Sequence, residues 1–102
     1  MNYGLSVLQF EQIVKVFASH KEIDEVILYG SRAKGTQKPY SDIDITFLGD
    51  NINFSLQQKI EIELDDLLLP YKFDVSLYKS IANIDLVEHI NRVGKTIYKK
   101  ES

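Results

Sequence analysis

The spacing of hydrophobic and polar residues changes several times along the chain, and each change predicts a new element. The first apolar residues recur at the spacing of a single helix face: Phe10, Ile13, Val14 and Phe17. Ser6 and Gln9 resemble a capping box, which predicts the start of this helix. The short apolar run EVILYG that follows is typical of a buried strand ending at Gly30.

Two later stretches show the strict alternation of a strand with one buried face. In SDIDITFL, the side chains pointing one way are Ile43, Ile45 and Phe47, and those pointing the other way are Asp42, Asp44 and Thr46. In YKFDVSLY, the apolar side consists of Tyr71, Phe73, Val75 and Leu77, and the polar side of Lys72, Asp74 and Ser76. We therefore expect both strands to carry aspartate on the face turned away from the core.

Helical spacing returns between and after these strands. A helix is predicted over residues 54–69, stopped by Pro70, because one face collects Leu56, Ile60, Leu64, Leu67 and Leu68. A last helix is predicted through Leu86, Val87, Ile90 and Val93, with Gly94 as a left-handed stop and KTIY as a short edge strand. The order of elements predicts an α+β fold, with helices packed on a small sheet, as one domain over residues 1–102.

Size and composition limit the class of protein. With 102 residues, 44% of them hydrophobic, the chain can form one compact domain with a single core. No run approaches the roughly 18 apolar residues of a membrane span, and the start of the chain has no signal-peptide pattern. We expect a soluble cytoplasmic protein without membrane contact. The absence of cysteine excludes disulfides, thiolate metal sites and a cysteine nucleophile.

The charge balance argues against a long nucleic acid as partner. The formal net charge is −3, with 12 basic and 15 acidic residues spread along the chain. Proteins that bind long DNA or RNA usually present a basic surface, because neutralising phosphates supplies most of the affinity. A single nucleotide remains compatible with this charge, since metal ions and a few amides can meet its phosphates.

An Asp-x-Asp pair opens the second predicted strand. Asp42 and Asp44 project from one face, about 6 to 7 Å apart at a rise of ~3.3 Å per residue. Two adjacent carboxylates repel each other unless something positive lies between them, and hard oxygen ligands suit Mg²⁺ or Mn²⁺ shared with phosphates. The pair predicts a binding site for a magnesium nucleotide. Asp74 is expected to be part of this site if its strand lies next to the strand of Asp44.

The Gly-Ser turn before this pair supplies a partner for phosphate. Gly30 has no Cβ, so a phosphate can approach its backbone closely. Ser31 is predicted to cap the short helical turn SRAKG, with its hydroxyl and the nearby amides facing an anion. Arg32, Lys34 and Lys38 lie in the same connection, and at least one of them is expected to neutralise phosphate charge.

Other residues have simpler interpretations. An Asp-x-Asp pair alone is often only solvated, and it is the combination with Gly30, Ser31 and Asp74 that favours a functional site. His20 and His89 are interpreted as surface residues or charge partners rather than ligands. Tyr29 and Tyr40, which flank the loop, are interpreted as packing residues rather than as platforms for a base.

Taken together, GSRAKGTQKPYSDIDI resembles the signature of the minimal nucleotidyltransferases, the smallest members of the DNA polymerase β-like nucleotidyltransferase superfamily. The resemblance extends from the first predicted helix to HINRVGKTIY and implies the palm-like fold with a small mixed sheet. It implies that Gly30 and Ser31 contact the nucleoside triphosphate, with Arg32 and Lys34 as further contacts, although Lys34 stands where many relatives have arginine. The implied catalytic and metal-binding carboxylates are Asp42, Asp44 and Asp74.

The reaction that this resemblance implies is an in-line attack by an acceptor hydroxyl on the α-phosphate of a nucleoside triphosphate, ATP above all, with pyrophosphate leaving. Two Mg²⁺ ions, or Mn²⁺ in their place, would stabilise the attacking and departing oxygens. Asp74 is the expected assistant in deprotonating the hydroxyl.

The resemblance also implies a partner. Larger enzymes of the superfamily carry an additional domain for the acceptor, and this chain ends about 28 residues after Asp74, so we expect a separate protein to hold the acceptor. The implied partner is a helical HEPN-type toxin, whose hydroxyl would receive AMP and which this chain would neutralise as an antitoxin. Two alternatives stay open: a binding module that neutralises its partner by contact alone, and a transferase acting on a small-molecule hydroxyl.

Overall fold

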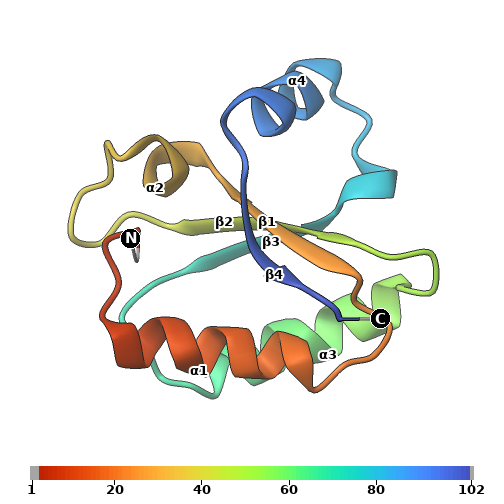
Figure 1. The fold of residues 1–102 in the computed structure, drawn as a ribbon, viewed down its shortest axis with the longest axis horizontal. Helices are drawn as coiled ribbons and strands as arrows, with labels where there is room; N and C mark the ends of the chain where they lie inside the picture. Colours follow the sequence, from red (N-terminus) through yellow and green to blue (C-terminus); the bar gives the residue numbers. More distant parts are fainter. Residues whose placement is uncertain (1–2, 102) are drawn as a thin grey trace.

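The computed structural model describes residues 3–101, and within that range the chain alternates helices and strands (Figure 1). The elements are α1 (Val7–Ala18), β1 (Glu25–Tyr29), α2 (Gly30–Lys34), β2 (Ile43–Leu48), α3 (Phe54–Asp65), β3 (Phe73–Leu77), the 3₁₀ helix η1 (Tyr78–Ser80), α4 (Ile84–Val93) and β4 (Lys95–Lys99). None of the helices in this range is long and apolar enough to cross a membrane.

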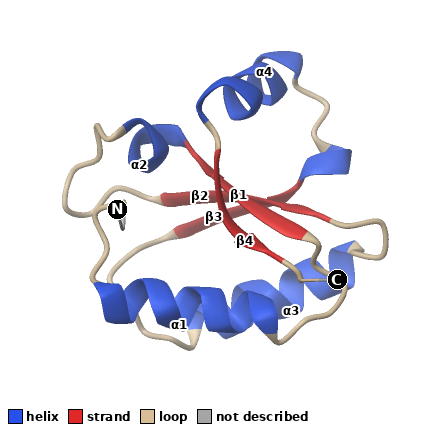
Figure 2. Ribbon diagram, in the orientation of Figure 1, coloured by secondary structure: helices blue, strands red, loops and turns tan. Residues whose placement is uncertain are grey.

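The four strands form one mixed sheet between two pairs of helices. The strand order is β3-β2-β1-β4, with β2 and β3 parallel and the other neighbours antiparallel. One face of the sheet is covered by α1 and α3, whereas α2 and α4 lie on the opposite side (Figure 2). The predicted α+β fold with a small mixed sheet is confirmed, and so is the edge strand near the end of the chain.

Alternation along the strands places the core between the sheet and the pair α1 and α3. Phe17 of α1 meets Phe47 of β2 edge to face, with ring centroids 5.7 Å apart. Burying each large apolar side chain contributes about 1.5 to 3 kcal/mol. The almost fully buried members of this core are Ile13, Phe17, Ile23, Val26, Leu28, Ile43, Ile45, Phe47, Ile52, Ile60 and Leu64.

The capping box predicted for the first helix is present. The Ser6 hydroxyl accepts a hydrogen bond from the Gln9 amide, and Oε1 of Gln9 accepts one from the Ser6 amide, each at 3.0 Å. These bonds satisfy two amides that have no partner within the helix. The sequence therefore determines the start of α1 locally.

The helix α3 begins at Phe54 as expected but ends at Asp65, so the predicted end at residue 69 was wrong. Asp65 and Asp66 put negative charge at the end of the helix where the macrodipole is also negative, and the last turn has no basic residue. Leu68 then takes a left-handed φ of +57° and donates its amide to the Asp65 carbonyl at 3.0 Å. Leu68 is consequently 89% exposed instead of joining the core.

Gly94 follows α4 as predicted, although not for the predicted reason. Its φ is −59°, so it is no left-handed stop. A Cβ at this position would overlap the carbonyl oxygen of Ile90 and would lie 2.7 Å from Cγ2 of Ile27. Glycine is therefore needed because α4 and β1 approach each other closely here.

The sheet face towards α2 and α4 carries polar side chains, among them Thr46 of β2 and Ser76 of β3. The Ser76 hydroxyl donates to Oγ1 of Thr46 at 2.9 Å, and Thr46 is fully buried. Because buried hydroxyl groups need such partners, this pair is the satisfied inner part of the polar face. The aspartates lie two residues before it on the same strands.

Candidate functional site

Asp44 and Asp74 lie side by side on neighbouring strands. The parallel register of β2 and β3 places the two residues directly opposite each other. Adjacent strands are about 4.8 Å apart, and both side chains share the polar face because the residues flanking them in sequence turn towards the core. Asp42 is exposed in the connection directly before β2. The condition set from the sequence, that the strands of Asp44 and Asp74 be neighbours, is therefore met.

The environment of Asp44 disfavours its charged form. Burial is the largest cause, followed by the negative charges of Asp74 and Asp42, and together they raise the pKa of Asp44 from 3.8 to about 6. The positive charge of Arg32 lowers this pKa by less than the other causes raise it. Negative charge thus accumulates at this end of the sheet, and a cation placed there would relieve it.

Gly30 joins the carboxylates to the turn that follows β1. Tyr29, the last residue of β1, lies opposite Asp44 in the ladder with β2, so the next residue reaches the aspartates. Gly30 has a left-handed φ of +74°, and a Cβ on it would overlap Oδ2 of Asp44. Both the backbone conformation and the contact with the carboxylate therefore require glycine.

The turn forms the short helix α2, but Ser31 does not cap it. The N-cap is Tyr29, which makes no side-chain cap bond. The predicted cap was wrong because β1 runs directly into α2 through Gly30 and leaves no loop residue in front of the helix. Ser31 is partly buried in the first turn, and Lys34 and Lys38 are exposed. Their contacts with a nucleotide stay predictions.

Arg32 lies inside the loop rather than open to solvent. It is 1% exposed, and its guanidinium donates to the carbonyl of Tyr3 at 2.9 Å and to that of Ser41 at 2.8 and 3.1 Å. The guanidinium also stacks on the Tyr71 ring, 4.7 Å from its centroid. We expected a loop cation available to phosphate, whereas the contacts of this side chain hold the backbone next to Asp42.

His89 was expected to be a surface residue or charge partner, whereas it is partly buried and contacts the turn at Gly30. Nε2 of His89 on α4 accepts a hydrogen bond from the Gly30 amide at 3.1 Å. The imidazole also meets the Tyr29 ring edge on, with centroids 6.1 Å apart. A signal was present in the sequence, because His89 falls between Leu86 and Val93 at helical spacing and hence on the apolar side of α4.

The other aromatic and histidine interpretations had mixed outcomes. His20 contacts Glu63, with 2.5 Å between Nε2 and Oε1, and its side chain is buried, so the expectation of a surface residue was wrong. Tyr29 packs in the interior, as expected, and burial raises the pKa of its hydroxyl. Tyr40 is 77% exposed, so the packing expected for it was wrong.

The aspartates form a suitable, though incomplete, set of ligands for a divalent cation. Within residues 3–101, no three carboxylate or imidazole groups come close enough together to form a finished metal cluster. Two observations nevertheless fit Mg²⁺ or Mn²⁺: the donors are hard oxygens, and the negative charges of Asp74 and Asp42 raise the pKa of Asp44. Phosphate oxygens and water would complete the coordination.

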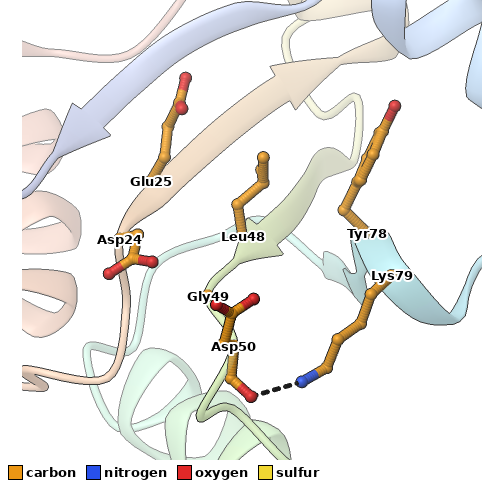
Figure 3. A pocket seen from close by; sticks show the side chains of 7 residues that line it. All are labelled: Asp24, Glu25, Leu48, Gly49, Asp50, Tyr78 and Lys79. Carbon is orange, nitrogen blue, oxygen red and sulfur yellow. Dashed lines mark hydrogen bonds between the residues drawn. The ribbon is translucent and has the colours of Figure 1, made fainter.

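A separate hollow of about 370 Å³ lies at the other end of the sheet, where β1 begins and β2 ends (Figure 3). In it, Nζ of Lys79 donates to the Asp50 carbonyl at 3.0 Å. Its lining consists of Asp24, Glu25, Leu48, Gly49, Asp50, Tyr78 and Lys79. The strand from Asp44 to Leu48 separates this hollow from the aspartates by about 13 Å at ~3.3 Å per residue, so it is not part of the site.

The sequence matches a protein-family model described as polymerase beta, nucleotidyltransferase, over residues 11–102. No curated protein matches it.

Solved structures share the fold at low sequence identity. A chain in a crystal structure of a toxin-antitoxin with AMP-PNP is 23% identical, with a TM-score of 0.72, covering 90% of this chain and 74% of that one. A chain in a complex of tri-AMPylated Shewanella oneidensis HEPN toxin with MNT antitoxin is 20% identical, with a TM-score of 0.66 and coverage of 91% and 71%. A nucleotidyltransferase described as putative, from Sulfolobus solfataricus, is 23% identical, with a TM-score of 0.56 and coverage of 91% and 78%.

Proposed function

The chain belongs to the polymerase beta nucleotidyltransferase family, and we propose that it transfers AMP from ATP to a hydroxyl group of a HEPN-type partner protein, which it thereby neutralises as an antitoxin. The observation that carries the proposal is the contact of Gly30 with Asp44, with Asp74 directly beside it. A turn suited to phosphate and paired carboxylates suited to a divalent cation meet at one point.

The turn and its cations bind the triphosphate in this proposal. Gly30 lets the turn approach the carboxylate of Asp44 closely, and Ser31 offers its hydroxyl and amide from the first turn of α2. Lys34 is exposed and free to contribute charge to the phosphates. Arg32 supports the connection from inside through its bonds to backbone carbonyls. Its part in nucleotide binding is therefore to hold the loop in shape.

Asp42, Asp44 and Asp74 would hold magnesium. When bound, two divalent cations would neutralise the triphosphate and stabilise the attacking and departing oxygens of the transfer. The carboxylate of Asp44 would be held ionised by that positive charge, although its pKa in the free chain is about 6. The absence of a Cβ on Gly30 lets this carboxylate lie directly next to the turn.

Asp74 is the proposed proton acceptor. It is exposed on the edge strand β3, where an acceptor hydroxyl can approach from solvent. As the hydroxyl oxygen bonds to the α-phosphorus, the bond from that phosphorus to the bridging oxygen breaks and pyrophosphate leaves. The hydroxyl proton passes to a carboxylate oxygen of Asp74. The remaining contribution of the protein is to position the reactants.

The partner is proposed from the structures that share the fold. One of them contains AMP-PNP in a toxin-antitoxin complex, and another pairs an AMPylated HEPN toxin with an MNT antitoxin. At 20 to 23% identity these likenesses support the fold, and the partner and its modification are our extension to this chain. ATP as the donor rests on the same support.

The test uses ATP labelled at the α-phosphate and, in parallel, at the γ-phosphate, with magnesium, this protein and a HEPN-type protein produced separately. We expect α-label and no γ-label on the HEPN-type protein after denaturing separation. Asp42→Ala should abolish the labelling, and Glu88→Gln, an exposed change on α4, should leave it intact. Neutralisation of the partner without any labelling would contradict the proposal and favour a module that acts by contact.

A further inference from the structure

Two elements far apart in the sequence lie against the backbone of Gly30. On one side, Oδ2 of Asp44 occupies the space that a Cβ would fill. On the other, Nε2 of His89 accepts the amide hydrogen at 3.1 Å. Figure 1 shows α2 and α4 on the same side of the sheet. The position of Gly30 relative to the carboxylate therefore depends on α4 as well as on its own turn.

The imidazole is itself fixed. A backbone amide only donates, so Nε2 of His89 is the acceptor of this bond. The edge-on contact with Tyr29 restrains the ring plane, at an angle of 82° between the two rings. Ile90, the next residue of α4, is 1% exposed and anchors the helix in the fold. His89 is thus a rigid acceptor, and the Gly30 amide already has its hydrogen-bond partner within the protein.

We infer that His89 is a positioning residue for nucleotidyl transfer: it holds the turn of Gly30 and Ser31 at a fixed distance from Asp44 and Asp74. The inference rests on the proposed function. Because the Gly30 amide is already bonded, the triphosphate meets groups further along the turn, beginning with Ser31. In-line attack depends on the relation between these groups and the carboxylates, so loss of the bond reduces kcat more than it changes KM.

The contact also has an opposite interpretation, in which His89 occupies an amide that phosphate needs and must leave before the nucleotide binds. The two interpretations predict changes of opposite direction. Removing a positioning acceptor lowers kcat and leaves KM nearly unchanged. Removing a competing acceptor lowers KM and leaves kcat unchanged or higher.

Two substitutions separate the hydrogen bond from the packing. His89→Phe keeps an aromatic ring beside Tyr29 but has no acceptor, whereas His89→Gln loses the ring and offers an amide oxygen to Gly30. Glu88→Gln, on the same helix and exposed, is the control. Thermal unfolding first establishes that each variant is folded, and His89→Leu replaces His89→Phe if the latter is not.

Two measurements are made on each variant. The first is hydrogen exchange of the Gly30 amide by NMR in the free chain, without nucleotide. The second is kcat and KM for transfer of α-label from ATP. For His89→Phe we expect exchange of Gly30 to accelerate about tenfold, and kcat to fall about tenfold with KM within about twofold. In His89→Gln, exchange of Gly30 should be slower and kcat higher than in His89→Phe. The Glu88 variant should match the wild type in both measurements.

Unchanged exchange of Gly30 in His89→Phe overturns the inference, whether or not the wild type transfers nucleotide. A lower KM without loss of kcat also overturns it and supports the competing interpretation. Faster exchange with unchanged kcat and KM reduces the contact to a structural one and removes its role in the reaction. A wild type that transfers no nucleotide contradicts the proposed function and, with it, the role of His89 in transfer. The exchange measurement requires no catalysis, so it still shows whether His89 holds the Gly30 amide.

Discussion

The two faces of the sheet differ in what their side chains do for the fold. Against α1 and α3, the strands present buried apolar residues such as Phe47 and Ile45, and every one of them stabilises the folded state. Towards α2 and α4, neighbouring strands present Asp44 and Asp74 in register. There, burial and the nearby carboxylates raise the pKa of Asp44 to about 6, so its charged form is less favourable in the fold than in water.

This difference shows that the need for stability does not explain the residues on the polar face. Two aspartates placed together cost free energy, and a chain selected for folding alone has no need of them. Gly30 adds to the cost, because glycine in a fixed left-handed conformation loses more chain entropy than another residue would. The unfavourable groups gather at one end of one face, which is the arrangement expected of a binding or catalytic site.

The largest expected effect comes from Asp44→Asn on activity. The change removes a charge that metal and triphosphate need while keeping the shape of the side chain, so transfer of α-label should fall about 10³-fold or more. The circular dichroism spectrum and the melting transition should remain those of a folded protein. A transfer rate within tenfold of the wild type would mean that Asp44 is not needed for the reaction. The polar face would then have no functional role that distinguishes it from the apolar face.

Phe47→Ala makes the opposite change, on the apolar face. Phe47 is 1% exposed and packs against Phe17, so its truncation should lower the free energy of unfolding by about 3 to 5 kcal/mol. Urea denaturation measures the loss, and Tyr40→Ala, at a residue that is 77% exposed, is the control with little effect. The folded fraction at low temperature should keep its kcat, and a specific loss of kcat would show that the two faces are coupled.

Gly30→Ala tests the point where fold and site meet. The added Cβ is strained at φ +74° and overlaps Asp44, so stability should fall by about 1 to 3 kcal/mol and transfer about 100-fold. Gly35→Ala is a matched control, because Gly35 has φ +78° but no atom within 4 Å of the added Cβ. It should lose similar backbone stability and keep its activity. Equal loss of activity in both variants would reduce Gly30 to a turn residue.

The smallest expected effect is a pH-dependent difference in stability between the wild type and Asp44→Asn. The pKa of Asp44 is about 6 in the folded protein against 3.8 as a reference for the unfolded chain. Below pH 3.8 the carboxyl group is neutral in both states, and its favourable contribution to folding is lost as pH rises through 6. As pH rises from 3.8 to about 6, the free energy of unfolding of Asp44→Asn should therefore increase relative to that of the wild type. The expected increase is about 1 kcal/mol after solvent screening.

Thermal unfolding of both proteins between pH 4 and 7 measures this gain, without metal or nucleotide. A difference that does not change with pH would mean that the carboxylates do not destabilise the fold. Adding magnesium at pH 7 should then reduce the difference in stability between the two proteins. A cation among the carboxylates stabilises the charged form of Asp44, which only the wild type has.

Local patterns predicted the elements well where near neighbours decide them. The capping box of Ser6 and Gln9, the alternation in the two aspartate-bearing strands and the turn at Gly30 all follow from residues a few positions apart. The end of α3 did not follow from periodicity. Apolar spacing continued to Leu68, but charge at the helix end and a left-handed backbone stopped the helix earlier.

What the sequence did not predict concerns contacts between distant segments. Arg32 was expected to contact phosphate, which stays a prediction, but the loop pattern did not show that carbonyls of Tyr3 and Ser41 enclose its side chain. Gly94 was expected to have a left-handed backbone, yet its role is to let α4 approach Ile27. These roles depend on residues that lie near in space only after the sheet and helices have packed.

The sequence by itself determined the order of helices and strands, the apolar face that forms the core, and the residue types of the site, because side-chain periodicity and turn chemistry act over a few residues. Only the tertiary structure decided that Asp74 lies beside Asp44, that Gly30 touches the Asp44 carboxylate, and that His89 accepts a hydrogen bond from the Gly30 amide. Strand order and helix placement are set by burial of the whole apolar surface, a property that no short stretch carries.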